Sequence, residues 1–204
     1  MSNYSDSSRD MDTGGRFTAK DAITTGAFGA IIIGIRFLFM LLGGISPYMW
    51  FASHAIDAFL IGPVFMLIVA RTRKNGPYII ISMVIALVFL ASTWMLLITS
   101  AIGGIICELI LGGSKFKSRV AMIIAFIVFN LGFIGDFMPL YFTKSEFMAK
   151  SMQSFSPEYL DTLNKIISGP SLAIVIASVV GSSIVGGLLG LALNRKHFEK
   201  AGVI

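Results

Sequence analysis

Six long apolar stretches alternate with short polar segments along the chain. The hydrocarbon core of a bilayer takes about 20 apolar residues of helix, and each stretch is close to that length. No charge separates the third stretch from the fourth, so their division rests on the polar residues of Ala91-Ser92-Thr93-Trp94. The pattern predicts an all-α membrane protein whose domain at 21–193 is a six-transmembrane-helix bundle, with spans at 21–42, 46–70, 77–94, 96–113, 120–141 and 170–193.

Basic residues cluster in four places: the polar arm 1–20, the segments 71–74 and 115–119, and the tail 194–204. Six spans place all four clusters on one side of the membrane. Basic residues are enriched on the cytoplasmic side, so both termini are predicted to be cytoplasmic. The arm lacks the apolar core and the small-residue cleavage site of a secretory signal.

Composition supports a lipid environment. Only 13% of the 204 residues are charged and 55% are hydrophobic, whereas soluble domains carry about 25% charged residues. The 16 Lys and Arg residues outnumber the 11 Asp and Glu residues, but they fall in short clusters rather than on one exposed face, which argues against a nucleic-acid partner. Cys107 is the single cysteine, which excludes a disulfide framework and a paired-cysteine metal or redox site.

The segment 142–169 is the only long connection, and it is predicted to lie outside the cell. Apolar residues recur in it every three or four positions, which predicts helical structure with one apolar face. Ser156-Pro157 has the form of a helix N-cap followed by proline at the first helical position. We expect two short amphipathic helices there, which either cover the membrane domain as a lid or lie on the lipid interface. The apolar positions are Met148, Met152, Phe155, Tyr159, Leu163 and Ile166.

Two of the predicted spans carry small residues at intervals of four, which places them along one helix face. Small residues allow helix backbones to approach closely within a membrane. Each stripe therefore serves either to pack the bundle internally or to dock another membrane protein. The stripes are Ala22, Gly26, Ala30 and Gly34 in the first span, and Ser178, Ser182, Gly186 and Gly190 in the sixth.

Ionisable residues inside spans are costly and usually face a partner or a wet cavity. Counted along their helices, Arg36, His54, Asp57 and Asp136 share the outer half of the bundle, whereas Glu108 lies near the inner end of the fourth span. An ion pair of Arg36 with Asp57 or Asp136 that fixes helix register is one interpretation.

The other interpretation is an outward-facing pocket bordered by these four residues. Aromatic and methionine side chains gather at the same level, which suits a flat, largely apolar ligand with a charged tail. The same aromatic residues are also typical of an interfacial belt. The predicted pocket residues are Arg36, Met40, Tyr48, Met49, Trp50, His54, Asp57, Asp136, Met138 and Tyr141.

Sequence motifs for catalysis or nucleotide binding are absent. No Gly-Lys dipeptide occurs, so the chain has no P-loop, and neither HExxH nor GxSxG is present. We therefore expect a protein that is not an enzyme, that holds no cofactor or metal of its own, and that takes any energy from other subunits.

The arm ending in Phe17-Thr18-Ala19-Lys20-Asp21, the small-residue first span, the six spans and the long fifth loop together resemble the substrate-binding S-components of energy-coupling factor (ECF) transporters. Within them, the chain is most similar to the bacterial Trep_Strep group. The resemblance implies a multi-pass cell-membrane protein that captures a micronutrient from outside. It also implies that Gly26 and Ala30, extended by Ala22 and Gly34, dock a transmembrane coupling subunit that carries two ATPase subunits.

Substrate identity follows from the resemblance only in outline. It implies haem or another flat apolar cofactor, or a vitamin. For haem, His54, Met49 or Met138 is a possible iron ligand, and Arg36 a possible partner for a propionate. The alternative hypothesis is a free-standing small permease or channel.

Overall fold

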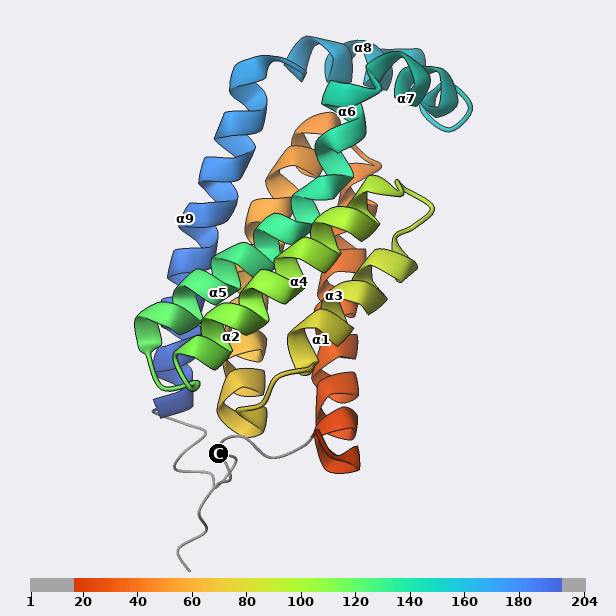
Figure 1. Cartoon of the computed structure of the whole chain (residues 1–204). Helices are drawn as coiled ribbons and strands as arrows, with labels where there is room; N and C mark the ends of the chain where they lie inside the picture. Colours follow the sequence, from red (N-terminus) through yellow and green to blue (C-terminus); the bar gives the residue numbers. More distant parts are fainter. Residues whose placement is uncertain (1–16, 196–204) are drawn as a thin grey trace, which may run out of the picture.

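A computed structural model describes residues 17–195, and every regular element in that range is a helix. The predicted arm and tail lie for the most part outside the described residues. Figure 1 shows a bundle of long helices with two short helices across one end. In chain order the elements are α1 (Ala19–Gly43), α2 (Pro47–Thr72), α3 (Pro77–Val88), α4 (Met95–Gly113), α5 (Arg119–Gly132), the 3₁₀ helix η1 (Phe133–Phe137), α6 (Met138–Phe142), α7 (Lys144–Ser151), α8 (Pro157–Ile166) and α9 (Gly169–Leu193).

Within residues 17–195, five helical stretches are long and apolar enough to cross a membrane, rather than the six predicted. The exception is α3, whose 12 residues rise only about 18 Å, well short of the hydrocarbon core. The chain turns over residues 89–94 before α4 begins. Two hydroxyl groups hold this turn: Thr93 Oγ1 accepts from the N–H of Met95 at 3.1 Å, and Ser92 Oγ donates to Asp136.

The fifth predicted span is one apolar stretch, Arg119–Phe142, but it is not one regular helix. Its winding tightens to 3₁₀ in η1 before α6 resumes. A Cβ on Gly135 would lie 2.9 Å from the Cα of Leu96, so glycine permits a close crossing with α4. A 3₁₀ stretch within a long helix often marks a functional position, and η1 contains Asp136.

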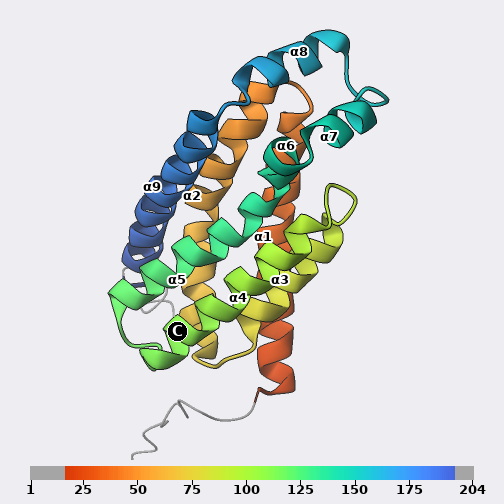
Figure 2. The ribbon, with the colours of Figure 1, turned by 45° about the horizontal axis from the view of Figure 1, so that its top comes forward.

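The helices α2 and α5 occupy the centre of the bundle. The first packs between α1 and α9, and the second contacts α4 and α9. Figures 1 and 2 show α1 beginning and α9 ending at one end of the bundle, with α7 and α8 at the other. The links 73–76 and 114–118 lie at the first of these ends, so we call it the basic end. We call α7 and α8 the cap.

Apolar side chains cover the sides of the bundle. Ile23 is 74% exposed, Leu109 69% and Ile174 67%. In water such a surface would be costly at about 25 cal/mol per Å², whereas acyl chains solvate it. The exposed apolar sides therefore agree with a bundle that lipid surrounds.

The two small-residue stripes have different surroundings. In α9, Gly186 and Gly190 pack against α2, and a Cβ on Gly190 would lie 2.7 Å from the carbonyl oxygen of Gly62. In α1, a Cβ on Gly26 or Gly34 would meet no atom within 4 Å. The α9 stripe thus contributes to internal packing, while the α1 stripe faces outward.

Glu108 caps a helix at the basic end. Its Oε1 accepts hydrogen bonds from the backbone N–H groups of Gly76 at 2.7 Å, Tyr78 at 3.1 Å and Ile79 at 3.1 Å, at the start of α3. A carboxylate is favourable at a helix N-terminus, because unpaired N–H groups and the helix dipole both present positive charge there. The intramembrane acid of the fourth span therefore has a structural role.

The close crossing of α2 and α9 leads to a stability prediction. A methyl group on Gly186 would lie 2.9 Å from the Cα of Phe59, so Gly186→Ala should destabilise the fold by about 1–3 kcal/mol. Gly181→Ala, on the open face of the same helix, should be neutral or slightly stabilising because alanine favours helix. Thermal unfolding in detergent compares the two variants, and equal melting temperatures would refute the proposed packing.

Candidate functional site

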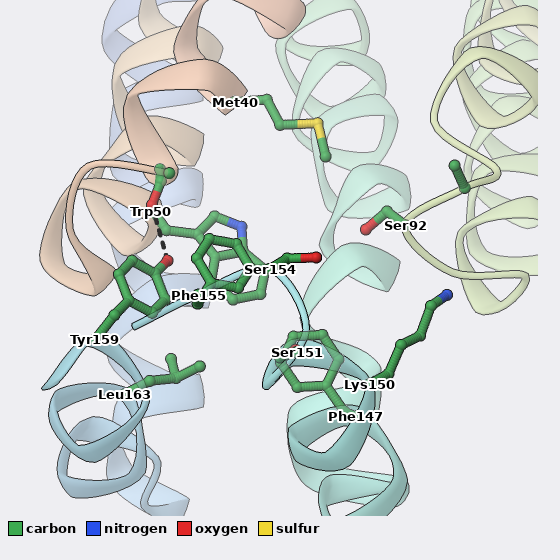
Figure 3. A pocket seen from close by; sticks show the side chains of 13 residues that line it. Met40, Trp50, Ser92, Phe147, Lys150, Ser151, Ser154, Phe155, Tyr159 and Leu163 are labelled. Atoms are coloured by element: carbon green, nitrogen blue, oxygen red, sulfur yellow. Dashed lines mark hydrogen bonds between the residues drawn. The ribbon is translucent and has the colours of Figure 1, made fainter. Parts of the chain in front are cut away.

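A cavity of about 350 Å³ opens between the bundle and the cap. Four parts of the chain enclose it: the end of α1, the first turn of α2, the α3–α4 turn, and the cap with its internal link (Figure 3). Segments more than a hundred residues apart in sequence thus meet around one space. Its lining consists of Met40, Gly43, Gly44, Trp50, Ala91, Ser92, Phe147, Lys150, Ser151, Ser154, Phe155, Tyr159 and Leu163.

The lining combines ring faces with a few polar groups. Trp50, Phe147, Phe155 and Tyr159 contribute aromatic surface, and Met40 contributes a thioether. Of the described residues that line the cavity, Lys150 is the only charged one, and Figure 3 shows it on the same side as Ser92. Apolar walls with a few polar groups are typical of small-molecule sites, and the cation would favour a molecule that carries an anionic group.

The cap is fixed to the bundle through Tyr159. Its hydroxyl group donates a 2.8 Å hydrogen bond to the carbonyl oxygen of Gly43, at the end of α1. The ring stacks on Phe155 with centroids 4.4 Å apart. Burial, together with the negative charge of Asp136, raises the pKa of Tyr159 to about 12, so the hydroxyl remains a donor at any physiological pH.

Beneath the cavity, Arg36 joins four helices at one level. Its guanidinium contacts Asp57 Oδ2 at 3.1 Å and Asn130 Oδ1 at 2.7 Å. Asn130 Nδ2 in turn donates to Ser183 Oγ at 3.0 Å. The guanidinium also lies over the Phe133 ring at 4.1 Å. Of the two carboxylates considered as partners for Arg36, the structure selects Asp57, and the network links α1, α2, α5 and α9.

His54 lies between this network and the cavity floor. Its ring packs against Phe133 and Phe137, with centroid distances of 5.1 and 4.2 Å. Nε2 is 3.8 Å from Asp136 Oδ2 and forms no hydrogen bond within the described residues. His54 is only 5% exposed and is not among the residues that line the cavity, so it lies below the lining.

Asp136 connects the buried layer to two walls of the cavity. One carboxylate oxygen accepts from Trp50 Nε1 at 3.0 Å, and the other accepts from Ser92 Oγ. Trp50 belongs to α2 and Ser92 to the α3–α4 turn, and both line the cavity. The indole also stacks on Phe137 at 5.3 Å. A single carboxylate, itself 2% exposed, therefore positions the two walls relative to each other.

A protein-family model described as a hypothetical bacterial integral membrane protein (Trep_Strep) matches residues 19–200. The chain belongs to the Trep_Strep family. No curated protein and no solved structure matches it. Family membership, together with the five apolar helices of spanning length, identifies a multi-pass protein of the bacterial membrane.

The predicted pocket residues of this Trep_Strep protein fall into three groups. Met40 and Trp50 line the cavity, while Arg36, His54, Asp57 and Asp136 lie buried beneath it. The remaining four lie elsewhere. Met49 is 48% exposed, and Met138 packs in the apolar cluster under the cap. Tyr48 borders an adjoining, more polar hollow, and the Tyr141 hydroxyl is hydrogen-bonded to Ser171 Oγ at 2.7 Å.

The pocket prediction did not include the cap residues that line the cavity. Phe155, Tyr159 and Leu163 belong to the predicted amphipathic stripe, so their burial against something was foreseeable. The sequence did not indicate a role for Lys150, because an exposed lysine on a short helix is common. The structure contains the two helices expected in this segment, and the N-cap at Ser156, which accepts from the N–H of Tyr159 at 3.2 Å, is confirmed.

The position of Asp136 gives a spectroscopic prediction. In a Trp94→Phe background, Trp50 is the only indole in the chain. The amide of Asp136→Asn is neutral and has one acceptor oxygen where Asp136 has two, so Trp50 and Ser92 both lose a charged partner and one of them also loses its acceptor, at a cost of about 1.5–3 kcal/mol. We expect a shift in the Trp50 emission maximum and faster quenching by acrylamide.

Asp57→Asn provides the matched control, because this equally buried carboxylate contacts Arg36 rather than Trp50. It should lower stability yet leave the emission of Trp50 unchanged. Identical spectra for Asp136→Asn and the parent protein would contradict the positioning role.

Proposed function

We propose that this protein is the membrane-embedded substrate-binding subunit of an ATP-driven importer of the energy-coupling factor type. The observation that carries the proposal is the cavity beneath the cap, which four separate parts of the chain enclose at one end of a lipid-facing bundle. Its volume of about 350 Å³ lies in the range of small-molecule sites. The basic clusters predict that this end faces outward.

The lining favours a flat, largely apolar substrate with an anionic group. Trp50 and Phe155 offer ring faces for stacking, and Lys150 offers a charge partner. Haem has these properties, as do other conjugated cofactors and some vitamins. For haem, Met40 and Tyr159 are the lining residues whose donor atoms suit iron, and the Tyr159 hydroxyl is already hydrogen-bonded to Gly43, which favours Met40. His54 is packed below the lining against Phe137.

Energy coupling is assigned to other subunits. The outward-facing α1 stripe of Ala22, Gly26, Ala30 and Gly34 supports docking of a transmembrane coupling subunit, because such a face lets another helix approach closely. Two ATPase subunits attached to that partner would then hydrolyse ATP. A permease that works alone needs a polar path through the inner half, where Glu108 is already occupied by the start of α3.

The docking proposal is tested by co-purification from the native membrane. Gly26→Leu should reduce the recovery of a membrane partner and two ATPases by about tenfold or more, because a bulky side chain separates the two backbones. It should leave the melting temperature unchanged, since a Cβ at Gly26 would meet no atom of another element within 4 Å in the described part of the chain.

Gly181→Leu is the matched control, because Gly181 lies in an equally open position on α9. Its recovery of partners should equal that of the parent protein. Equal losses in both variants would place docking elsewhere. Substrate uptake by the chain alone in liposomes would favour the permease and contradict the proposal.

A further inference from the structure

A second hollow, of about 290 Å³, lies at the basic end of the bundle. It is bounded by the start of α1, the end of α2 and the link that follows α2. Four of the side chains that line it are cationic: Lys20, Arg71, Arg73 and Lys74. The hollow lies at the opposite end of the bundle from the cavity beneath the cap, so it is separate from the proposed substrate site.

Local contacts hold these cations close together. Thr18 and Asp21 form a capping box at the start of α1, in which Asp21 Oδ2 accepts from the N–H of Thr18 at 2.8 Å. The same oxygen accepts from Lys74 Nζ at 3.0 Å. The Phe17 ring lies over Gly76, whose φ of +120° favours glycine. The first turn of α1 is thereby joined to the link between α2 and α3.

Two of the four cations, Lys20 and Arg73, have no acidic partner in the part of the chain that the structure describes. Among the described residues that line the hollow, Asp21 is the only acidic one, and its carboxylate is already engaged by Thr18 and Lys74. Like charges held close together repel each other, and the N-terminus of α1 adds partial positive charge. An anion in the hollow would relieve this repulsion.

We infer that this hollow binds a phosphate group. Arginine and lysine side chains converge on it, and guanidinium and ammonium groups are the usual protein partners of phosphate. Two exposed apolar residues are within three positions of the lining residues Lys20 and Thr18 in sequence and offer an apolar surface: Ile23 in α1, 74% exposed, and Phe17 just before α1, 37% exposed. Acyl chains can run along this surface while a headgroup occupies the hollow, so an anionic phospholipid is the favoured source, ahead of free phosphate.

Native mass spectrometry of the full chain, delipidated in detergent, tests this inference. Phosphatidylglycerol should be retained as a bound species, and zwitterionic phosphatidylcholine should be retained much less. A parallel titration with inorganic phosphate distinguishes the two sources. Displacement of the lipid by millimolar phosphate would support the phosphate site and assign it to the free ion.

The variant Lys20→Gln/Arg73→Gln removes two of the four charges. Retention of phosphatidylglycerol should fall about fivefold for each charge, hence about 25-fold in total. The matched control is Lys117→Gln/Arg119→Gln, which removes two exposed cations at the same end of the bundle, outside the hollow. The control should retain the lipid within twofold of the parent protein, and melting temperatures should agree among all three proteins.

Two results would overturn the inference. Equal losses in both double variants would show that general surface charge, rather than the hollow, attracts the lipid. Equal retention of phosphatidylglycerol and phosphatidylcholine by the parent protein, with no response to inorganic phosphate, would show that no phosphate site exists.

Discussion

Lipid surrounds the helices, so each charged group buried in the bundle must find its partner within the protein. Arg36 meets this requirement through Asp57 and Asn130, and the chain of contacts continues to Ser183. Removing one member of such a pair leaves an uncompensated buried charge, which typically costs about 3–5 kcal/mol. The network therefore fixes the positions of four helices relative to one another along the bundle axis. The floor of the cavity beneath the cap depends on that arrangement.

Asp136 extends the same constraint to the cavity walls. It lies in a 3₁₀ stretch that interrupts an otherwise continuous span, and it binds one residue from α2 and one from the α3–α4 turn. His54 stands between the two buried carboxylates, 3.8 Å from Asp136. The buried charge pairs and the cavity-lining residues Trp50 and Ser92 thus belong to one connected structure. Of the two small-residue stripes, the one on α9 packs against α2 through Gly186 and Gly190, whereas the one on α1 faces outward.

The features that could be predicted from the sequence are those that depend on residues close together in the chain. Helix positions could be predicted because the length and hydrophobicity of an apolar stretch are local properties of the sequence. The predicted ends of α1, α2, α4 and α9 agree with the structure within about two residues. The early end of α3 could not be predicted from the sequence, because Phe89 and Leu90 are as apolar as a transmembrane helix requires. The turn that follows depends on a hydrogen bond from Ser92 to Asp136, which is 44 residues away in sequence. The charged residues of the site were foreseeable because charge in a span is rare, whereas Lys150 on the cap resembles any surface lysine.

The central claim is that the cavity beneath the cap binds a small molecule from outside while energy comes from other subunits. Native mass spectrometry of the protein, purified gently from its own membrane, tests it most directly. The account predicts one equivalent of a retained small molecule, lost in Trp50→Ala and kept in Trp94→Ala, whose indole lies outside the cavity lining. Absence of any retained molecule under conditions that preserve bound lipid, or equal retention by both variants, would contradict it.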